Sequence, residues 1–358
     1  MKLLKLSLIA LSCAGLLGCE NPGGINNNTQ VRDYSSTFSP LPENALYPIS
    51  NPYNETKERL GESLFWDPIL SGDQNTSCAS CHHPDFGWAD GRQFSIGSDG
   101  IGLGPSRYGF EVTPIHSPTI MNVAFTGLNN NDIANSFVSG GYFWDLRART
   151  LEEQALGPIK NPIEMLGSNI SEHEIMSTIV NRLQAIPEYV ELFEQAFPVN
   201  NAINSENLVK ALATFQRKII TSNTRFDQFM AGNQAIFNLQ EIAGLNKFID
   251  SGCARCHSGP MLSDNRIHPG EAVIEGVVVR TPSLRNISAT APYMHDGSSA
   301  RLVDAIAIYE NRDDIEVNIN DDDFADIEAF LRTLDSTNVY QNIPEMVPSG
   351  LTVGGDIN

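Results

Sequence analysis

The pentapeptides Cys78-Ala79-Ser80-Cys81-His82 and Cys253-Ala254-Arg255-Cys256-His257 decide how this chain of 358 residues is organised. Both have the pattern Cys-x-x-Cys-His, which is typical of the covalent attachment of a c-type haem. Two thiols one turn apart can add to the vinyl groups of a haem, and the adjacent imidazole then faces the iron. The sequence therefore predicts two haem c groups, attached at Cys78, Cys81, Cys253 and Cys256 and ligated by His82 and His257.

Two other uses of these four cysteines are disulfides and a zinc site. Disulfides suit an exported protein, and zinc binds sets of four thiolates. Neither use explains why a histidine directly follows each cysteine pair, and the two pairs lie far apart in the sequence. Haem attachment is therefore the better interpretation.

The N-terminal residues MKLLKLSLIALSCAGLLG (1–18) have the composition of an export signal, with lysines followed by an apolar stretch. The stretch Leu16-Leu17-Gly18-Cys19 resembles a bacterial lipobox, in which the cysteine becomes acylated. An ordinary cleaved signal with an unrelated Cys19 is the alternative, and the apolar run is too short to span a bilayer comfortably. We expect a periplasmic protein with a lipid anchor at Cys19. Because Glu20 is not the Asp associated with retention in the inner membrane, we expect the anchor in the outer membrane.

Acidic residues outnumber basic ones by a wide margin. The chain has 43 Asp and Glu against 23 Lys and Arg, a net charge of −20, and loss of residues 1–18 would lower it to −22. This charge argues against a nucleic-acid partner, because nucleic acids select basic surfaces. It is compatible with a basic redox partner attracted by the field of the protein, although solubility alone explains it equally well.

Periodic apolar residues predict a mainly α-helical fold with long loops. The expected helices cover about 55–65, 171–196, 205–220, 238–250, 300–311 and 322–334. The expected divisions of the chain are a signal peptide (1–18), a flexible tether (19–43), an N-terminal haem domain (44–222), a C-terminal haem domain (223–341) and a loose tail (342–358).

A weak internal repeat relates the two halves. After the first haem motif come SPTIMN (117–122) and then Phe143-Trp144-Asp145. After the second motif come TPSLRN (281–286) and then Met294-His295-Asp296. The same order of parts predicts two related cytochrome c-like domains, each holding one haem.

Longer stretches around these motifs resemble the bacterial dihaem cytochrome c peroxidases. They are the opening that contains LFWD (64–67) and ends at His82, FWDLRARTLEEQALGPIKNPIEM (143–165), and TPSLRNISATAPYMHDG (281–297). The resemblance runs from about residue 55 to residue 335. It implies two mainly helical domains whose haems face a shared interface, with hydrogen peroxide reacting at the N-terminal haem.

The resemblance also implies roles for individual residues. His82 and His257 become the proximal ligands, Glu164 the distal acid, Gln154 its companion, and Trp144 the indole between the haems. A carboxyl group in an apolar pocket can move the proton that cleavage of the O–O bond requires. The alternatives are a surface position for Glu164 and a plain core position for Trp144.

The stretch 95–100 (SIGSDG) departs from the ordinary members of this family, which carry a histidine there that closes the resting N-terminal haem. This chain has no histidine in that stretch. We therefore expect an open first haem that meets peroxide without prior activation. His116, which follows an apparent insertion, is the nearest substitute for the missing ligand.

Tyr309 stands where ordinary members place a methionine ligand to the C-terminal haem. A phenolate stabilises ferric and higher states, whereas a thioether raises the reduction potential. Met261, Met294 and a plain core position for Tyr309 are the alternatives. An open first haem beside a His/Tyr second haem resembles the MauG-type enzymes, which use peroxide to oxidise residues of a partner protein.

The family also binds calcium between its domains, through carbonyl groups that match Thr290 and Pro292 and through an asparagine side chain. His116 occupies the asparagine position here, which weakens the case for calcium. His295 and Asp296 match a family motif near the second haem. The resemblance implies a role at the interface, and a purely structural role is the alternative.

Three functions are compatible with these features: a MauG-like peroxide-dependent oxidase, a conventional peroxidase that takes electrons from a small c-type cytochrome, and an electron carrier without enzymatic activity. The carrier has no use for Gln154 and Glu164, and the conventional peroxidase needs a second haem of high potential, which Tyr309 argues against. The sequence therefore favours the first of the three.

Overall fold

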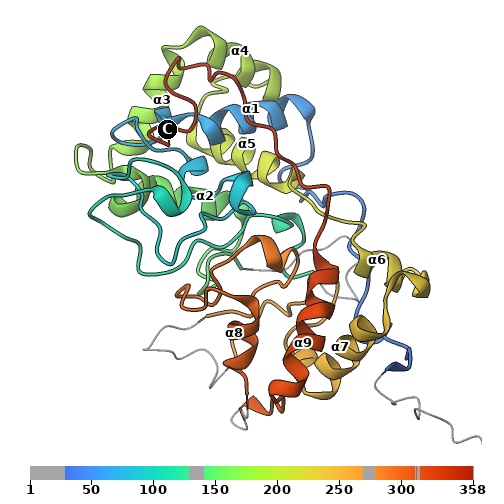
Figure 1. Ribbon diagram of the computed structural model, residues 1–358. Coiled ribbons are helices and arrows are strands. Elements are labelled where there is room, and N and C mark those ends of the chain that lie inside the picture. The colour runs from blue at the N-terminus through green and yellow to red at the C-terminus, as the bar shows by residue number, and fades with distance from the viewer. Residues whose placement is uncertain (1–28, 129–140, 269–278, 311, 313–314, 358) are drawn as a thin grey trace, which may run out of the picture.

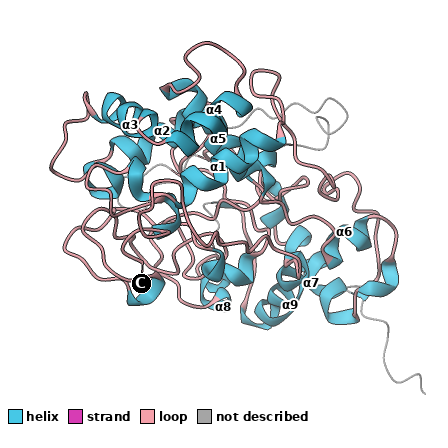
Figure 2. Cartoon of the chain, turned by 90° about the horizontal axis from the view of Figure 1, so that it is seen from above, coloured by secondary structure: helices cyan, strands magenta, loops and turns pink. Residues whose placement is uncertain are grey.

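The computed structural model describes residues 29–128, 141–268, 279–310, 312 and 315–357. Within these residues the regular elements are helices, joined by long loops (Figure 2). This confirms the predicted mainly α-helical class. None of the helices in this part of the chain is both long enough and apolar enough to cross a membrane. The expected signal peptide and Cys19 lie outside the described residues.

The N-terminal half is built around the helix pair α1 (Glu55–Trp66) and α5 (Ser205–Lys218). A Cβ atom at Gly61 of α1 would collide with the carbonyl of Ala211 in α5, so glycine permits this close approach of the two backbones. The other helices of this half are α2 (Leu151–Lys160), α3 (Ile175–Gln184) and α4 (Pro187–Ala196). The helix expected at 171–196 is therefore two helices, because Pro187 begins a new one.

The C-terminal half repeats this arrangement with the pair α7 (Leu239–Asp250) and α9 (Asp321–Leu331), at the opposite end of the molecule (Figure 1). Here a Cβ atom at Gly244 would collide with the carbonyl of Asp326. The shorter helices of this half are α6 (Arg225–Met230) and α8 (Leu302–Ala307). Each half thus has its own crossing of two helices at a glycine, and the two apolar cores are separate clusters.

The internal repeat predicted from the sequence is present in the backbone. Tyr142 pairs with Ala148, and Tyr293 pairs with Ser299, each across a turn of the same length. The residue after each tyrosine, Phe143 or Met294, has a positive φ, of 65° and 71° respectively. Trp144 and His295, the next residues along the chain, thus occupy equivalent positions in the two turns.

The two repeats meet at Thr221, just before the C-terminal half begins. Asn122 and Asn286, the last residues of the two repeated hexapeptides, both have a left-handed backbone. The side-chain amides of both residues donate to the buried hydroxyl of Thr221. The distance from Asn122 Nδ2 to Thr221 Oγ1 is 2.7 Å. Thr221 therefore joins the two halves through side-chain hydrogen bonds.

Thr221→Val is expected to destabilise the protein, because it removes the acceptor of two buried amide groups while keeping the shape of the side chain. The expected loss is about 1–3 kcal/mol for each amide left without its acceptor. Urea-induced unfolding of the holoprotein measures it. The exposed Thr337 provides the control Thr337→Val, and a free energy of unfolding equal to that of this control would contradict the role of Thr221.

Residues 29–43, which we expected to belong to the flexible tether, lie against the C-terminal half. Tyr34 and Phe38 are 5% and 1% exposed. The hydroxyl of Tyr34 donates to Asn246 Oδ1 at 2.8 Å, and the backbone N–H of Leu41 donates to Asp227. The described part of the expected tether is therefore packed against the C-terminal half, because burial of its aromatic side chains lowers the free energy of the folded chain.

The C-terminal segment from residue 342 returns to the N-terminal half, contrary to the expected loose tail (Figure 1). The N–H of Gly354 donates to the carbonyl of Trp66, and its own carbonyl accepts from the hydroxyls of Ser77 and Ser80. Val347 is buried in the N-terminal core. These contacts join residues far apart in sequence, so no local pattern in the segment indicates them.

Candidate active site

The two Cys-x-x-Cys-His motifs form matching turns. Short 3-10 helices cover Cys78–Ser80 and Cys253–Arg255, and in each motif the backbone N–H of the histidine donates to the carbonyl of the first cysteine. All four cysteines are present without a disulfide. Within the described residues there is also no cluster of three or more His, Cys, Asp or Glu side chains suited to a metal ion.

The imidazoles of His82 and His257 are oriented in the same way. Nδ1 of His82 lies 3.1 Å from the carbonyl oxygen of Trp88, and Nδ1 of His257 lies 3.0 Å from that of Leu262. Because a carbonyl can only accept, Nδ1 carries the proton in both rings and Nε2 keeps its lone pair for a metal. Burial lowers the pKa of both histidines, which keeps them in the neutral form that binds iron.

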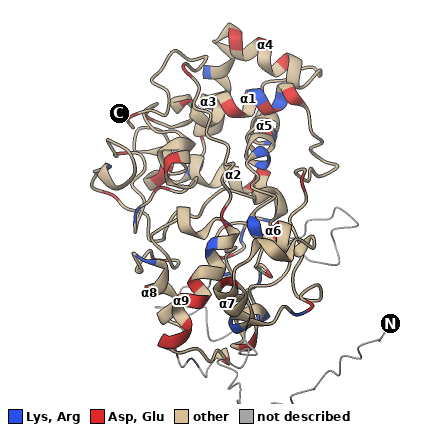
Figure 3. Ribbon diagram, turned by 45° about the vertical axis from the view of Figure 1, so that its right-hand side comes forward, with Lys and Arg blue, Asp and Glu red and all other residues tan. Residues whose placement is uncertain are grey.

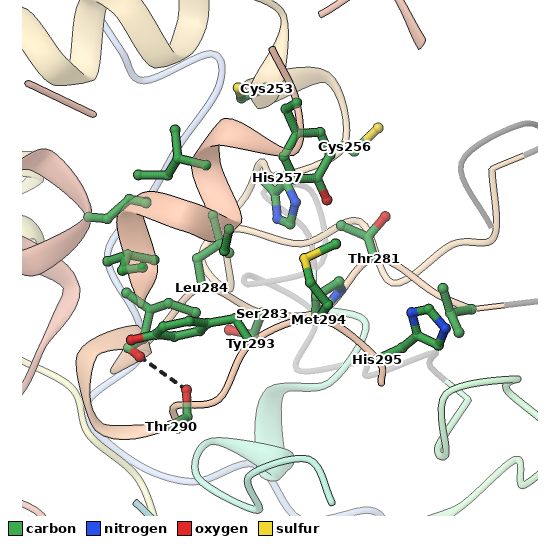
Figure 4. A pocket seen from close by; sticks show the side chains of 18 of the residues that line it. Cys253, Cys256, His257, Thr281, Ser283, Leu284, Thr290, Tyr293, Met294 and His295 are labelled. Carbon is green, nitrogen blue, oxygen red and sulfur yellow. Dashed lines mark hydrogen bonds between the residues drawn. The ribbon is translucent and has the colours of Figure 1, made fainter. Parts of the chain in front are cut away.

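A cavity of about 230 Å³, the second cavity, opens beside the second motif (Figure 4). Cys253, Cys256 and His257 line one side of it, and the ring of His257 points into the space. Much of the remaining wall is apolar, and its aliphatic residues are Val279, Leu284, Ile287, Leu302, Ala305, Ile306, Ile315, Val317, Ile319, Ile327 and Leu331. An apolar wall with two thiols and one imidazole fits a haem.

Arg280 supports this fit, although the sequence did not indicate it. It lines the cavity, and burial lowers the pKa of its guanidinium to about 10. Among the described residues, the acceptors of its hydrogen bonds are neutral: the carbonyl of Phe143 and the side-chain oxygen of Asn265. The carboxylates of a bound haem would supply the negative charge that a buried guanidinium needs. The only signal in the sequence is an arginine directly before the second repeated hexapeptide.

Tyr309 lines the same cavity as His257, from the turn that follows α8. The helix expected at 300–311 ends at Ala307, and the N–H of Tyr309 donates to the carbonyl of Ile306. Met294 also lines the cavity, and Figure 4 shows its side chain on the side toward which the His257 ring points. Met261 instead lies buried in a separate apolar cluster with Leu41 and Phe125.

Glu164 lies in a π-helical turn (Pro162–Leu166) directly after α2. Asn161 begins this turn, accepting from the N–H of Ile163 and donating to Glu164 Oε1 at 2.6 Å. Burial raises the pKa of Glu164, and the bond from Asn161 opposes this rise. Burial also raises the pKa of the Cys81 thiol to about 12, with smaller contributions from charges that include Glu164. The acid therefore lies near the first attachment site, and Gln154 is half-buried on α2, which contacts its turn.

The loop 95–100 packs against the turn of Glu164. The N–H of Ser98 donates to the carbonyl of Ile163 at 3.0 Å, and a Cβ atom at Gly97 would collide with the backbone of Glu164. Arg107, which the sequence did not indicate, holds this loop: its buried guanidinium donates to the carbonyls of Ile96 and Gly97 at 2.7 Å each. The loop 95–100, which has no histidine, is thus fixed beside Glu164.

His116 and Trp144 lie at the contact between the two halves. The indole N–H of Trp144 donates to the carbonyl of His116 at 2.8 Å, and the N–H of His116 donates to the carbonyl of His295 at 2.8 Å. All three residues line the second cavity, as do Thr290 and Pro292. Nδ1 of His116 is bonded to the carbonyl of Arg92. The structure thus brings together the residues predicted for the interface and for calcium.

A family model described as di-haem cytochrome c peroxidase matches residues 55–235. The cytochrome c551 peroxidase of Pseudomonas aeruginosa is 31% identical over 323 residues, which cover 84% of each chain. The methylamine utilization protein MauG of Methylorubrum extorquens is 30% identical over 331 residues, 85% of each chain. A solved MauG-like protein associated with microbial copper homeostasis has a TM-score of 0.67 and 28% identity, over 83% of this chain and 95% of that one.

Proposed function

The chain belongs to the di-haem cytochrome c peroxidase family, and we propose that within this family it is a MauG-like peroxide-dependent oxidase. It is a haem peroxidase with two haem cofactors. The relatives include both cytochrome c peroxidases and MauG proteins at similar identity. The choice between the two therefore depends on the residues of this chain. An electron carrier without enzymatic activity is set aside because the relatives are named peroxidases.

The position of Tyr309 carries the proposal. Its side chain lines the cavity that also receives His257 and the two thiols of the second motif. We propose that Cys253 and Cys256 bind the second haem covalently and that His257 and Tyr309 hold its iron. Bound haem supplies redox-active iron, and an anionic oxygen ligand favours the more oxidised states of that iron. This composition suits a site that stores an oxidising equivalent.

Met294 favours the second candidate, a conventional peroxidase that takes electrons from a small c-type cytochrome. Its thioether reaches the same cavity, and a thioether ligand would raise the reduction potential of the second haem. Ligation by Tyr309 would thus lower the reduction potential of the second haem, whereas ligation by Met294 would raise it.

Substitution of each candidate ligand separates the two functions. In the electron paramagnetic resonance spectrum of the ferric holoprotein we expect one high-spin haem, at the open first site, and one low-spin haem. Tyr309→Phe should abolish the low-spin signal and Met294→Leu should leave it unchanged. Met261→Leu is the matched control, because Met261 lies outside the cavity wall. Loss of the signal in Met294→Leu alone would support the conventional peroxidase.

At the first site we propose that Cys78, Cys81 and His82 hold the other haem and that Glu164 handles the proton of hydrogen peroxide. A carboxylate oxygen of Glu164 takes the proton from one peroxide oxygen and returns it to the leaving oxygen as water forms. The companion Gln154 orients the peroxide. Because the loop 95–100 has no histidine, we propose that the distal side of this haem is open to peroxide without prior activation.

Trp144 is proposed as the side chain that carries an electron between the two sites. Its hydrogen bond to the carbonyl of His116 and its place in the wall of the second cavity support this role. A calcium ion on the carbonyls of Thr290 and Pro292 stays a prediction, and it would need a ligand other than the bonded Nδ1 of His116.

The proposed partner of the oxidase is a protein, either a substrate of oxidation or a small cytochrome. Acidic residues gather on α9, whose first turn begins with the exposed Asp321 and Asp322 (Figure 3), and they would attract a basic partner. We further propose a periplasmic location with a lipid anchor at Cys19, on the basis of the lipobox-like residues 16–19.

A further inference from the structure

An aromatic column leads from the first attachment site to the surface on the side of the C-terminal segment. Trp88, whose carbonyl holds Nδ1 of His82, is completely buried. Its indole stacks on the ring of Tyr340, with centroids 6.2 Å apart and planes at 21°. The indole N–H also donates to the carbonyl of Tyr340 at 2.8 Å. A continuous chain of contacts therefore joins the imidazole of His82 to Tyr340.

The outer end of this column has the parts that oxidation of a tyrosine needs. Tyr340 is partly exposed, and its hydroxyl donates to Glu62 Oε1 at 2.6 Å. Burial raises the pKa of Tyr340 to about 12, and the hydrogen bond to Glu62 adds to the rise. A phenol with so high a pKa loses an electron readily only if its proton leaves as well. Glu62 is an acceptor already in contact with that proton.

The internal repeat shows that folding does not require this column. At the second site the carbonyl that holds the histidine belongs to Leu262, an aliphatic residue in the same backbone conformation as Trp88, with φ of 47° and 57°. Leu262 is completely buried as well. An indole is thus unnecessary for orienting the histidine or for filling the core beneath it. The aromatic pair is specific to the site near Glu164.

We propose that Trp88 and Tyr340 form a second outlet for oxidising equivalents, which leads from the first haem site to a surface site at Tyr340 and Glu62. This outlet is separate from the route through Trp144 to the second haem. The proposal rests on the proposed function, because hydrogen peroxide is the oxidant. The surface site accepts a one-electron reductant when no partner protein draws on the second haem.

The electrons and protons of this outlet balance as follows. Trp88 gives one electron toward the first haem site and regains one from Tyr340. Tyr340 at the same time transfers its phenolic proton to Glu62 and becomes a neutral radical. An external one-electron reductant supplies the missing electron, and Glu62 returns the proton. The hydrogen bond at 2.6 Å places Glu62 to accept the proton when Tyr340 is oxidised and to return it when the radical is reduced.

The test is covalent trapping of the radical. The ferric holoprotein is mixed with hydrogen peroxide and a nitroso spin trap in the absence of any partner, and the adducts are located by peptide mass spectrometry. We expect an adduct on Tyr340 in the wild type and its loss in Trp88→Phe, which interrupts the column one step earlier. Tyr340→Phe should instead increase oxidation of buried residues of the N-terminal core such as Met165.

Tyr108→Phe is the matched control. Tyr108 is 64% exposed and lies in the same half of the chain, outside the aromatic column. This variant should leave the adduct on residue 340 unchanged. If peroxide alters the haem absorption but label appears on Tyr108 and other exposed tyrosines and not on Tyr340, the outlet is overturned and the proposed function stands. If peroxide leaves the haem absorption unchanged, the proposed function fails and the outlet fails with it.

Discussion

Glu164→Gln is expected to slow the reaction of the holoprotein with hydrogen peroxide by about 10²–10⁴-fold, the usual contribution of a positioned acid–base group. The substitution keeps the size of the side chain and its contact with Asn161, but it removes the carboxylate that we propose as the proton acceptor. Both haems should remain bound. Stopped-flow absorption measures the rate, and the ratio of haem to protein checks the occupancy.

The pH dependence of this reaction provides a second test of Glu164. Burial raises the pKa of this carboxyl group above its ordinary value. Only the ionised form can accept a proton from peroxide, so the rate should fall as the pH decreases through the raised pKa. In Glu164→Gln this dependence should disappear. Glu153→Gln, at an exposed position on α2, is the control and should match the wild type. A wild-type rate in Glu164→Gln would remove this residue from the mechanism.

Replacement of both cysteines of one motif is expected to halve the content of covalently bound haem. In the double variant Cys253→Ala/Cys256→Ala the second site would lose both of the proposed thioether bonds, so denaturation should release whatever haem it still holds. The reciprocal variant Cys78→Ala/Cys81→Ala is the matched control for the first site. Haem-stained denaturing gels and intact mass measure the attached haem. Two retained haems in either denatured variant would contradict covalent attachment at these cysteines.

These paired variants also separate the two sites spectroscopically. Loss of the second haem should remove the low-spin signal assigned to His257 and Tyr309. Loss of the first haem should remove the high-spin signal and the reaction with peroxide. If the low-spin signal instead depends on Cys78 and Cys81, the assignment of the open site to the N-terminal half is wrong.

The sequence alone determined the features that depend on residues close together in the chain. A Cys-x-x-Cys-His motif places its reactive groups within one turn, so Cys78, Cys81 and His82 are recognisable without any tertiary contact. The internal repeat could also be predicted from the sequence, because each half contains the same short elements in the same order. Its backbone equivalents, such as the turns at Phe143 and Met294, follow that local order.

Tertiary structure alone decided which distant residues support these motifs. Arg107 donates hydrogen bonds to the loop 95–100, Arg280 lines the second cavity, and Tyr340 stacks on Trp88. Each of these contacts joins segments that no periodicity in the sequence connects. The packing of the C-terminal segment likewise could not be predicted from the sequence. Its hydrogen bonds to Trp66 and Ser77 are made by the backbone of Gly354, which every residue type has. Local patterns encode how a segment buries its own side chains. Partners that are brought together only when the two halves fold leave no mark in the spacing of residues.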